Sequence, residues 1–511
     1  MRKIAFLLAV ISVFSVCFIS CTDNGGQTDT SKVENDETTT LGSSDNVTDP
    51  VVDFYADLPT GSYNDDVFNF LLPDVGWCDY DMMVIDENDG DTVNSALFQR
   101  NVVVEELLGI QIDESIKSAS AALSELRAMK GSNDNFYNCY FGTASQCNTM
   151  ALEGLLVDMN DMVEINQEKP WWDSNFNDYI KINDSSYVLF GDLNVTYVGG
   201  TFALGFNTNM INEYGLTSPY EYYTNGTWTW DNMHQMLAKV SEDKNGDGSY
   251  HSFDYDVFGL VGHSNQIRCF IMSAGVELTT RGSDGIPDLN TNNESYFDVF
   301  RDMMNMFVIP ENCVFKGCTL DNNLYNEYNS STVSGEATEG YIQIFNDGRS
   351  LFHLNGIAAF KSCRNASIPY GLVCIPKYSS SQKDYVSVRY SGVGGVAIPS
   401  GFDEEGLDMN ATVVECMAAY SHKYVTPAFV EITLYFKYAK DEQSVNILKE
   451  MIERPGYCDL ALLYDWGGIC TVLEKQSMAR RSEISAPIGG IKTKFDNAAE
   501  STYDLTIEKT E

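Results

Sequence analysis

Short apolar runs of the strand type alternate with stretches of helical periodicity along most of this chain. Asp81 to Ile85, Phe136 to Phe141 and Phe202 to Phe206 are typical of strands, and helical patterns cover Val93 to Leu108 and Ser145 to Leu156. Apolar residues three or four apart indicate a helix face, whereas a short continuous apolar run indicates a buried strand. Their alternation favours an α/β fold.

The second half of the chain continues this pattern. Thr229 to Val240 predicts a helix with Thr229 as its N-cap, and Asp441 to Ile452 predicts another. Gly371 to Ile375 predicts a strand that ends at a proline. The last stretch, from Thr493, is polar and predicts a solvated tail or an edge helix.

Composition excludes several classes of protein. Hydrophobic residues make up 44% of the 511 residues, which is ample for a large core, so a mostly disordered chain is excluded. The formal net charge is −41. So acidic a chain argues against nucleic acid as a partner, since the phosphate backbone attracts cations.

The first 21 residues have the pattern of a secretion signal. Arg2 and Lys3 precede an apolar stretch that is short for a membrane span, and the stretch ends at Ser20 before Cys21. This end resembles a bacterial lipobox, with Phe18 departing from the usual leucine. We expect a signal peptide over 1–21, lipidation of Cys21, and a polar tether over 22–51.

Eleven cysteines remain once Cys17 and Cys21 are set aside. None shows zinc-ligand spacing, so we expect most of them to be small core residues. Two spacings would allow a disulfide: Cys313 with Cys318, or Cys363 with Cys374.

Three predicted strands suggest where a ligand would bind. In open α/β sheets ligands sit beyond the carboxyl ends of strands. This rule selects Glu87, which follows the first strand, and Thr143, which follows the second. It also selects Asp192, in the loop ahead of the third.

One acidic loop matches a calcium-binding pattern. Oxygen-bearing side chains at alternate positions converge on a hard cation, and a glycine at the sixth position allows the turn. The expected ligands of a structural Ca²⁺ are Asp243, Asn245, Asp247, Ser249 (through its carbonyl) and Asp254. The alternative is a polar turn between a helix and a strand.

Some tryptophans lie in sequence contexts typical of loops. Trp466 stands between Asp465 and two glycines, and Trp171 and Trp172 follow a proline. A flat aromatic face suits the C–H-rich face of a sugar, with carboxylates nearby for the hydroxyls. These four residues are therefore candidate ligand contacts. The alternative is that the rings cover a small satellite core.

The order of several motifs resembles the extracellular solute-binding proteins of bacterial ABC importers, in the maltodextrin-binding-like branch. The matching segments are Gly154–Met159 (GLLVDM), Tyr187–Met210, Trp228–Asp231 (WTWD), Gly348–Tyr378 and Tyr464–Gly468 (YDWGG). The resemblance spans about 400 residues, and the order of the motifs is more specific than any one of them.

This resemblance implies a two-lobed periplasmic-binding-protein-like α/β fold with a hinged cleft and crossing strands. The crossings are expected near 194–201, 391–396 and 423–427. Lobe one would comprise 52–195 with 397–425, lobe two 196–396 with 426–490, and 491–511 would be a polar tail. An aromatic site of the family falls near Phe360.

The resemblance also implies a function. The protein would be a lipid-anchored monomer outside the cell membrane that captures an oligosaccharide between its lobes and delivers it to an ABC permease. No catalytic motif appears in the sequence, so we expect no enzyme activity. A surface glycoside-acting enzyme and a binding protein for a non-sugar solute remain as alternatives.

Overall fold

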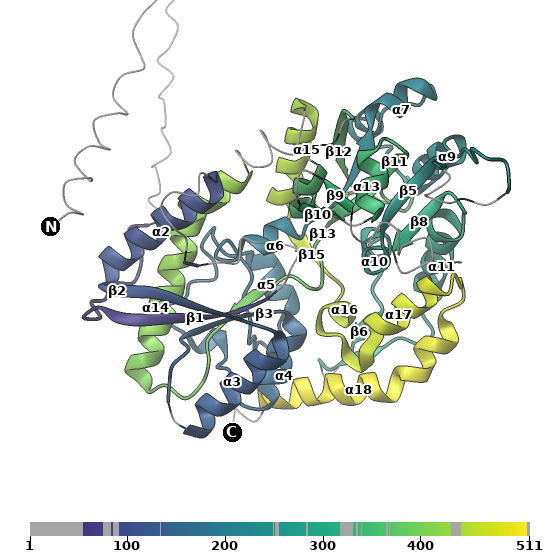
Figure 1. Cartoon of the computed structure of the whole chain (residues 1–511). Coiled ribbons are helices and arrows are strands. Elements are labelled where there is room, and N and C mark those ends of the chain that lie inside the picture. Colours follow the sequence, from purple (N-terminus) through teal and green to yellow (C-terminus); the bar gives the residue numbers. More distant parts are fainter. Residues whose placement is uncertain are drawn as a thin grey trace, which may run out of the picture. The chain divides into compact units, whose positions relative to one another are not determined.

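A computed structural model divides the chain into two units, Met1–Asp53 and Phe54–Glu511 (Figure 1). It describes residues of the second unit only: 55–74, 83–84, 91–132, 134–248, 250, 255–282, 285–316, 331–333, 336–338, 340–363, 366, 368–430 and 441–507. Within these ranges no helix has both the length and the apolar character needed to cross a membrane.

One sheet forms the centre of what we call lobe one. Its strand order is β14 (Gly395–Ala397), β3 (Cys139–Gly142), β1 (Asp66–Pro73) and β2 (Ile110–Lys117). Strand β1 is parallel to both β2 and β3, whereas β14 returns antiparallel to β3. Parallel strands need crossover helices, which here are α2 (Thr92–Leu108) and α3 (Ala119–Ser132).

Both faces of strand β1 are buried from Phe68 to Leu72. Phe68 and Phe70 pack in one apolar cluster with α14 (Glu404–Tyr420), while Leu71 packs in another with α3 and α4 (Ala144–Leu152). Successive side chains of a strand point to opposite faces, so helices on both sides exclude water from it. Of the strand predicted at Asp81–Ile85, only Met83 and Val84 lie among the described residues. Neither belongs to a strand, so the prediction is wrong for these two residues.

A second sheet forms the centre of lobe two. Its order is β12 (Tyr370–Cys374), β4 (Phe202–Asn207), β11 (Ser350–Gly356), β5 (Phe258–His263) and β8 (Cys313–Lys316). Strand β5 is parallel to β11 and β8, and β4 is antiparallel to β11 and β12. These mixed sheets with their helices confirm the predicted α/β class.

The remaining elements connect or cover the two sheets. The longer helices are α9 (Trp230–Lys239), α11 (Glu294–Met303), α15 (Glu442–Glu453), α17 (Ile469–Met478) and α18 (Ser485–Ile507). The shorter helices are α5 (Ser174–Ile180), α6 (Val195–Gly199), α7 (Thr208–Glu213), α8 (Pro219–Thr224), α10 (Arg268–Ser273), α13 (Gly340–Asn346), α16 (Leu460–Tyr464), η2 (Met159–Asp161), η3 (Ser264–Gln266), η4 (Met304–Val308), η5 (Ile357–Cys363), η6 (Ser421–Val425) and η8 (Trp466–Gly468). Three small sheets pair β6 (Thr279–Arg281) with β7 (Pro287–Leu289), β9 (Ser331–Val333) with β10 (Glu336–Thr338), and β13 (Ser387–Val388) with β15 (Gly456–Tyr457).

Local sequence signals place several of these elements correctly. The Thr229 side chain accepts a hydrogen bond from the Asn232 amide and caps α9, as predicted. Strand β12 coincides with the run predicted at Gly371–Ile375, and α2 with the helix predicted at Val93–Leu108.

Two antiparallel segments join the lobes. Leu189 pairs with Val396, and Thr201 pairs with Arg389, so the chain enters and leaves lobe two side by side. Gly200 allows this close approach, because a Cβ there would lie 2.2 Å from the Cγ1 atom of Val393. These bridges flank the two stretches predicted as crossings, 194–201 and 391–396, the first of which contains helix α6.

The third predicted crossing, at 423–427, lies partly in η6, which packs against α2 in lobe one. The chain then reaches α15, which packs against β12 in lobe two, through residues 431–440, which lie outside the described residues. The sheet of lobe one takes its return strand from Gly395, two residues before the predicted boundary at 397.

The predicted polar tail is instead the C-terminal part of a long helix. Helix α18 (Ser485–Ile507) runs along the lower edge of Figure 1 and covers most of the predicted tail, 491–511. Phe495 and Ala499 are fully buried on it. Of the two expectations for this stretch, the structure shows the edge helix and not the solvated tail, because two apolar side chains one helical turn apart pack it against the core.

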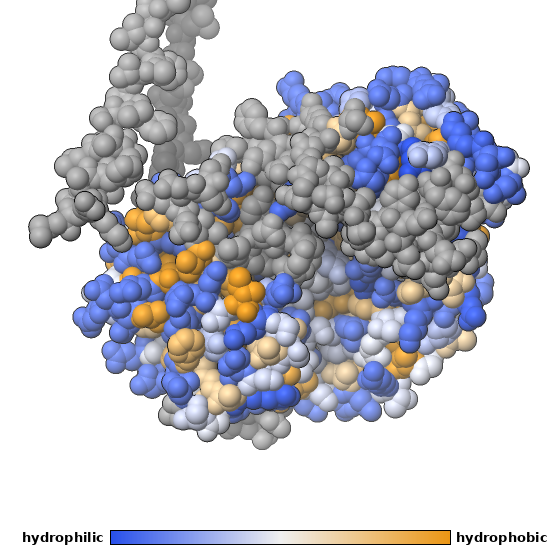
Figure 2. Space-filling model, in the orientation of Figure 1, coloured by the Kyte–Doolittle hydropathy of each residue, from blue (hydrophilic) through white to orange (hydrophobic). Residues whose placement is uncertain are grey.

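Hydrophilic residues cover most of the described surface in Figure 2, while apolar residues gather over the lobe that holds β1 and β2. Exposed apolar side chains on these elements include Val67 and Ile116.

Candidate functional site

Polar side chains meet at the carboxyl end of β5. The turn after this strand carries Ser264, Asn265 and Arg268. Ser264 Oγ donates to the Glu474 carboxylate of α17 at 2.9 Å, and Asn265 Nδ2 donates to the Tyr390 hydroxyl at 3.1 Å. Tyr390 lies on the second crossing segment. We call these five residues the β5-edge cluster.

The β5-edge cluster holds two buried polar atoms with unused hydrogen-bonding capacity. The Nη1 of Arg268 and the Oδ1 of Asn265 have no partner in the described part of the chain, although the Nε of Arg268 donates to the Asn265 carbonyl at 3.0 Å. Arg268 is only 8% exposed. Buried polar atoms are normally hydrogen-bonded, so a donor and an acceptor together suit a hydroxyl group, which both accepts and donates.

A second polar network stabilises the point where the lobes join. The Asp173 carboxylate, at the start of α5, accepts from the Tyr197 hydroxyl at 2.7 Å and from the Gly456 amide at 3.0 Å. Arg389 lies over the Tyr197 ring at 5.1 Å and donates to the Thr201 hydroxyl at 2.6 Å. Burial raises the pKa of Tyr197 well above its usual value, so the phenol remains a neutral donor.

The residues predicted at strand ends have structural partners. Thr143 caps α4 by accepting from the Gln146 amide at 3.3 Å. Asp192 and His422 lie 2.5 Å apart, and this hydrogen bond raises the pKa of His422. Asp465, with a left-handed backbone, accepts from the Cys470 amide at 2.9 Å. Glu87 lies outside the described residues.

The predicted aromatic contacts are buried. Trp171, Trp172, Trp466 and Phe360 are each at most 4% exposed. Trp466 stacks on Tyr464 with ring centres 4.7 Å apart, and its ring nitrogen donates to Thr502. Among the described contacts, none joins Trp466 to the other three rings. All four rings therefore pack in the core, which is the alternative expected for the tryptophans, and their contact with a ligand stays a prediction.

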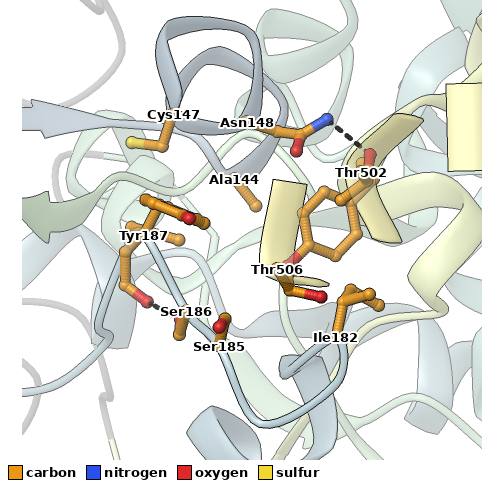
Figure 3. Close-up of a pocket in the computed structure, with 11 residues that line it drawn as sticks. Ala144, Cys147, Asn148, Ile182, Ser185, Ser186, Tyr187, Thr502 and Thr506 are labelled. Carbon is orange, nitrogen blue, oxygen red and sulfur yellow. Dashed lines mark hydrogen bonds between the residues drawn. The ribbon is translucent and has the colours of Figure 1, made fainter. Parts of the chain in front are cut away.

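A small pocket lies between the two lobes' helices (Figure 3). Its cavity volume is about 10 Å³, which is room for about one water molecule. Helix α4 and the segment 182–188 line one side, and Tyr464, Thr502 and Thr506 line the other. Its lining is uncharged.

The predicted calcium loop has the internal bonds of a tight turn. Asp243 accepts from the amides of Gly246 and Gly248, each at 2.7 Å, and these bonds lower the pKa of its carboxyl. Asn245 donates to Asp247 at 3.0 Å. Ser249 and Asp254 lie outside the described residues, and those described contain no group of three acidic, histidine or cysteine side chains arranged for a metal.

Most of the described cysteines are buried, as predicted for small core residues. Nine lie among the described residues, all are free, and eight of them are buried. Cys363 and Cys374 therefore form no disulfide. Cys21 lies outside the described residues.

Sequence reasoning missed the β5-edge cluster. The strand-end rule selected residues in lobe one. The apolar run Phe258–His263 is also followed by polar residues, Ser264-Asn265-Gln266. Applying the same rule to this strand would have found Asn265. The contributions of Tyr390 and Glu474 could not be found in this way, because they come from distant segments.

No protein-family model matches the chain, and no curated protein matches it. Solved structures do match. The sugar-binding protein MalE from Xanthomonas citri has a TM-score of 0.56 at 14% identity, over 87% of this chain and 100% of that one. The ABC substrate-binding protein Lmo0181 from Listeria monocytogenes, in complex with cycloalternan, has a TM-score of 0.52 at 11% identity, over 86% and 99%.

UspC of M. tuberculosis also matches, with a TM-score of 0.52 at 14% identity, over 85% of this chain and 100% of that one. The chain has the two-lobed fold of ABC solute-binding proteins. This agrees with the fold expected from the motif order. In solute-binding proteins of this fold, the lobes close about a hinge around the ligand.

Glu415 of α14 generates a pH prediction for lobe one. It is 1% exposed and accepts from the Trp172 ring nitrogen at 2.9 Å, and burial raises its pKa to about 7. The folded state therefore retains a proton that the unfolded state loses above about pH 4.5. The stability that this carboxyl contributes is complete below that pH and is lost as pH rises to about 7.

The substitution Glu415→Gln keeps a hydrogen-bond acceptor but cannot ionise. We expect it to reduce the fall in unfolding free energy between about pH 5 and 7. One carboxyl contributes up to about 1.4 kcal/mol per pH unit to this fall. Urea unfolding followed by tryptophan fluorescence measures it. Glu405→Gln, at an exposed position of the same helix, is the control and should keep the wild-type slope. An unchanged slope in Glu415→Gln would contradict the assignment.

Proposed function

We propose that this protein is a non-catalytic extracellular solute-binding protein that captures an oligosaccharide between its lobes and delivers it to an ABC permease as a monomer. The β5-edge cluster carries the proposal, because it combines strand-end and crossing residues with an unpaired donor and acceptor. The solved neighbours support it: one is described as a sugar-binding protein, and another was solved with cycloalternan.

The polar chemistry of the cluster fits a sugar. One sugar hydroxyl can accept from Arg268 Nη1, and one can donate to Asn265 Oδ1. Tyr390 joins this turn to the crossing segment, so a solute bound there would contact the moving part of the protein. Ligand then shifts the population towards the closed state if it contacts both lobes better in that state.

We expect one class of glycan to raise the melting temperature of the protein, because a ligand that binds only the folded state stabilises it by about 2.7 kcal/mol at a hundredfold excess over Kd. Differential scanning fluorimetry with maltotetraose, a cyclic α-glucan and β-linked oligosaccharides measures this shift. Asn265→Ala should lose it. Asn209→Ala, an exposed asparagine in α7 of lobe two, should retain it.

Other results would favour the alternatives. A shift with peptides but with no glycan would indicate a non-sugar solute. Shortening of the glycan after prolonged incubation, detected by chromatography, would indicate a glycoside-acting enzyme.

We propose that Cys21 is lipidated and holds the protein on the outer face of the cell membrane through the polar tether. The lipobox-like end of the apolar stretch supports this. We expect Cys21→Ser to move the protein from the membrane pellet to the culture medium, measured by immunoblot after fractionation. Retention of the variant in the pellet would contradict lipid anchoring.

We propose that the loop beginning at Asp243 binds a structural Ca²⁺. The support is the alternating oxygen side chains together with the Gly248 amide bonded to the first aspartate. We expect calcium to raise the melting temperature and a chelator to reverse this. Asp243→Asn should abolish the response, and Asp384→Asn, an exposed aspartate elsewhere, should leave it intact. An equal response in both variants would contradict the site.

A further inference from the structure

Helix α18 contacts both lobes. Its first half lies on lobe two, where Lys492 Nζ is 2.6 Å from the Asp288 carboxylate and 3.2 Å from the Leu289 carbonyl, both on β7. Phe495 packs edge-on against Trp466, with ring centres 5.6 Å apart. A Cβ on Gly467 would lie 3.0 Å from the Phe495 backbone, so the helix fits closely against η8.

The second half of α18 lies against lobe one. Asn148 Nδ2, on α4, donates to the Thr502 hydroxyl at 3.0 Å (Figure 3). One turn later, Asn183 Nδ2 donates to the Thr506 hydroxyl at 3.1 Å. Thr502 and Thr506 are both 4% exposed, so bulk water does not compete freely for these bonds.

Thr502 belongs to both sets of contacts. Its hydroxyl accepts from Asn148 and from the ring nitrogen of Trp466 at 3.1 Å, and it donates to the Ala498 carbonyl at 2.9 Å. A hydroxyl offers one donor and two acceptor sites, so this group is fully used. Separating α4 from α18 would leave buried polar groups unpaired until water entered.

We infer that α18 is a strap between the lobes and that Thr502 is a positioning residue that sets how readily they separate. The inference rests on the proposed function in one respect: lobe movement would serve solute capture. The strap acts beside the pocket of Figure 3 and contacts no residue of the β5-edge cluster in the described hydrogen bonds. It therefore changes the opening of the cleft rather than solute contacts.

Hydrogen exchange of the full-length, solute-free protein, read by mass spectrometry, tests the inference. Thr502→Val removes the hydroxyl at almost constant volume. We expect exchange in α4 and in 182–188 to become about two- to tenfold faster, as the loss of one net hydrogen bond implies. Thr502→Ser restores the hydroxyl and should restore protection.

Ser501→Ala is the matched control. Ser501 is exposed, and its hydroxyl bonds only within the helix, to the Asn497 carbonyl. The Ser501→Ala variant should show the same hydrogen exchange as the wild-type protein. Faster exchange of Thr502→Val confined to α18, with α4 and 182–188 unchanged, would overturn the inference, because Thr502 would then stabilise only its own helix.

Asn148→Ala covers the case in which Thr502→Val fails to fold. It removes the lobe-one donor and leaves the bond between Trp466 and Thr502 in place. We expect faster exchange in 182–188 but wild-type exchange in α16 and η8. Unchanged exchange in 182–188 would also overturn the inference. Neither experiment needs a solute, so a negative glycan screen would not affect the result.

Discussion

The antiparallel pairing of the two crossing segments is the constraint on which the rest of the structure depends. The bridges from Leu189 to Val396 and from Thr201 to Arg389 bring together residues that lie about two hundred positions apart. Each bridge fixes the end of one sheet relative to the other. The buried polar network of Asp173, Tyr197 and Arg389 surrounds this pairing, and such a network tolerates few alternative arrangements because each broken bond leaves a buried group unpaired.

This arrangement explains why the candidate site is assembled from distant segments. The turn after β5 belongs to one sheet, Tyr390 belongs to the return crossing, and Glu474 comes from a helix near the C-terminus. None of these side chains is distinctive alone. Their chemistry depends on the crossing segments, which set the distance between the β5 turn and Tyr390.

Sequence signals predicted the class of fold, because apolar periodicity and caps are local. Thr229 and the α2 pattern show this clearly. Sequence signals failed where a segment had no clear apolar pattern or where burial depended on a distant partner. Strand β1 carries an asparagine between two phenylalanines and was not predicted, although helices on both of its faces bury it. Trp466, between an aspartate and two glycines, looked exposed, but Phe495 and Thr502 of α18 cover it. The strand-end rule predicts the kind of position at which the candidate site lies, beyond the carboxyl end of a strand. It selected residues beside other strands and not beside β5.

The free cysteines have a consequence for the proposed export of the chain. Burial raises the pKa of Cys313 and Cys416 to about 12, so these two thiols carry almost no reactive thiolate at neutral pH in the folded state. That protection exists only after folding. An exported chain with eleven unpaired thiols would be open to oxidation and mispairing while unfolded. Burial in the two cores is therefore the protection that the structure gives these thiols, where many secreted proteins rely on disulfides.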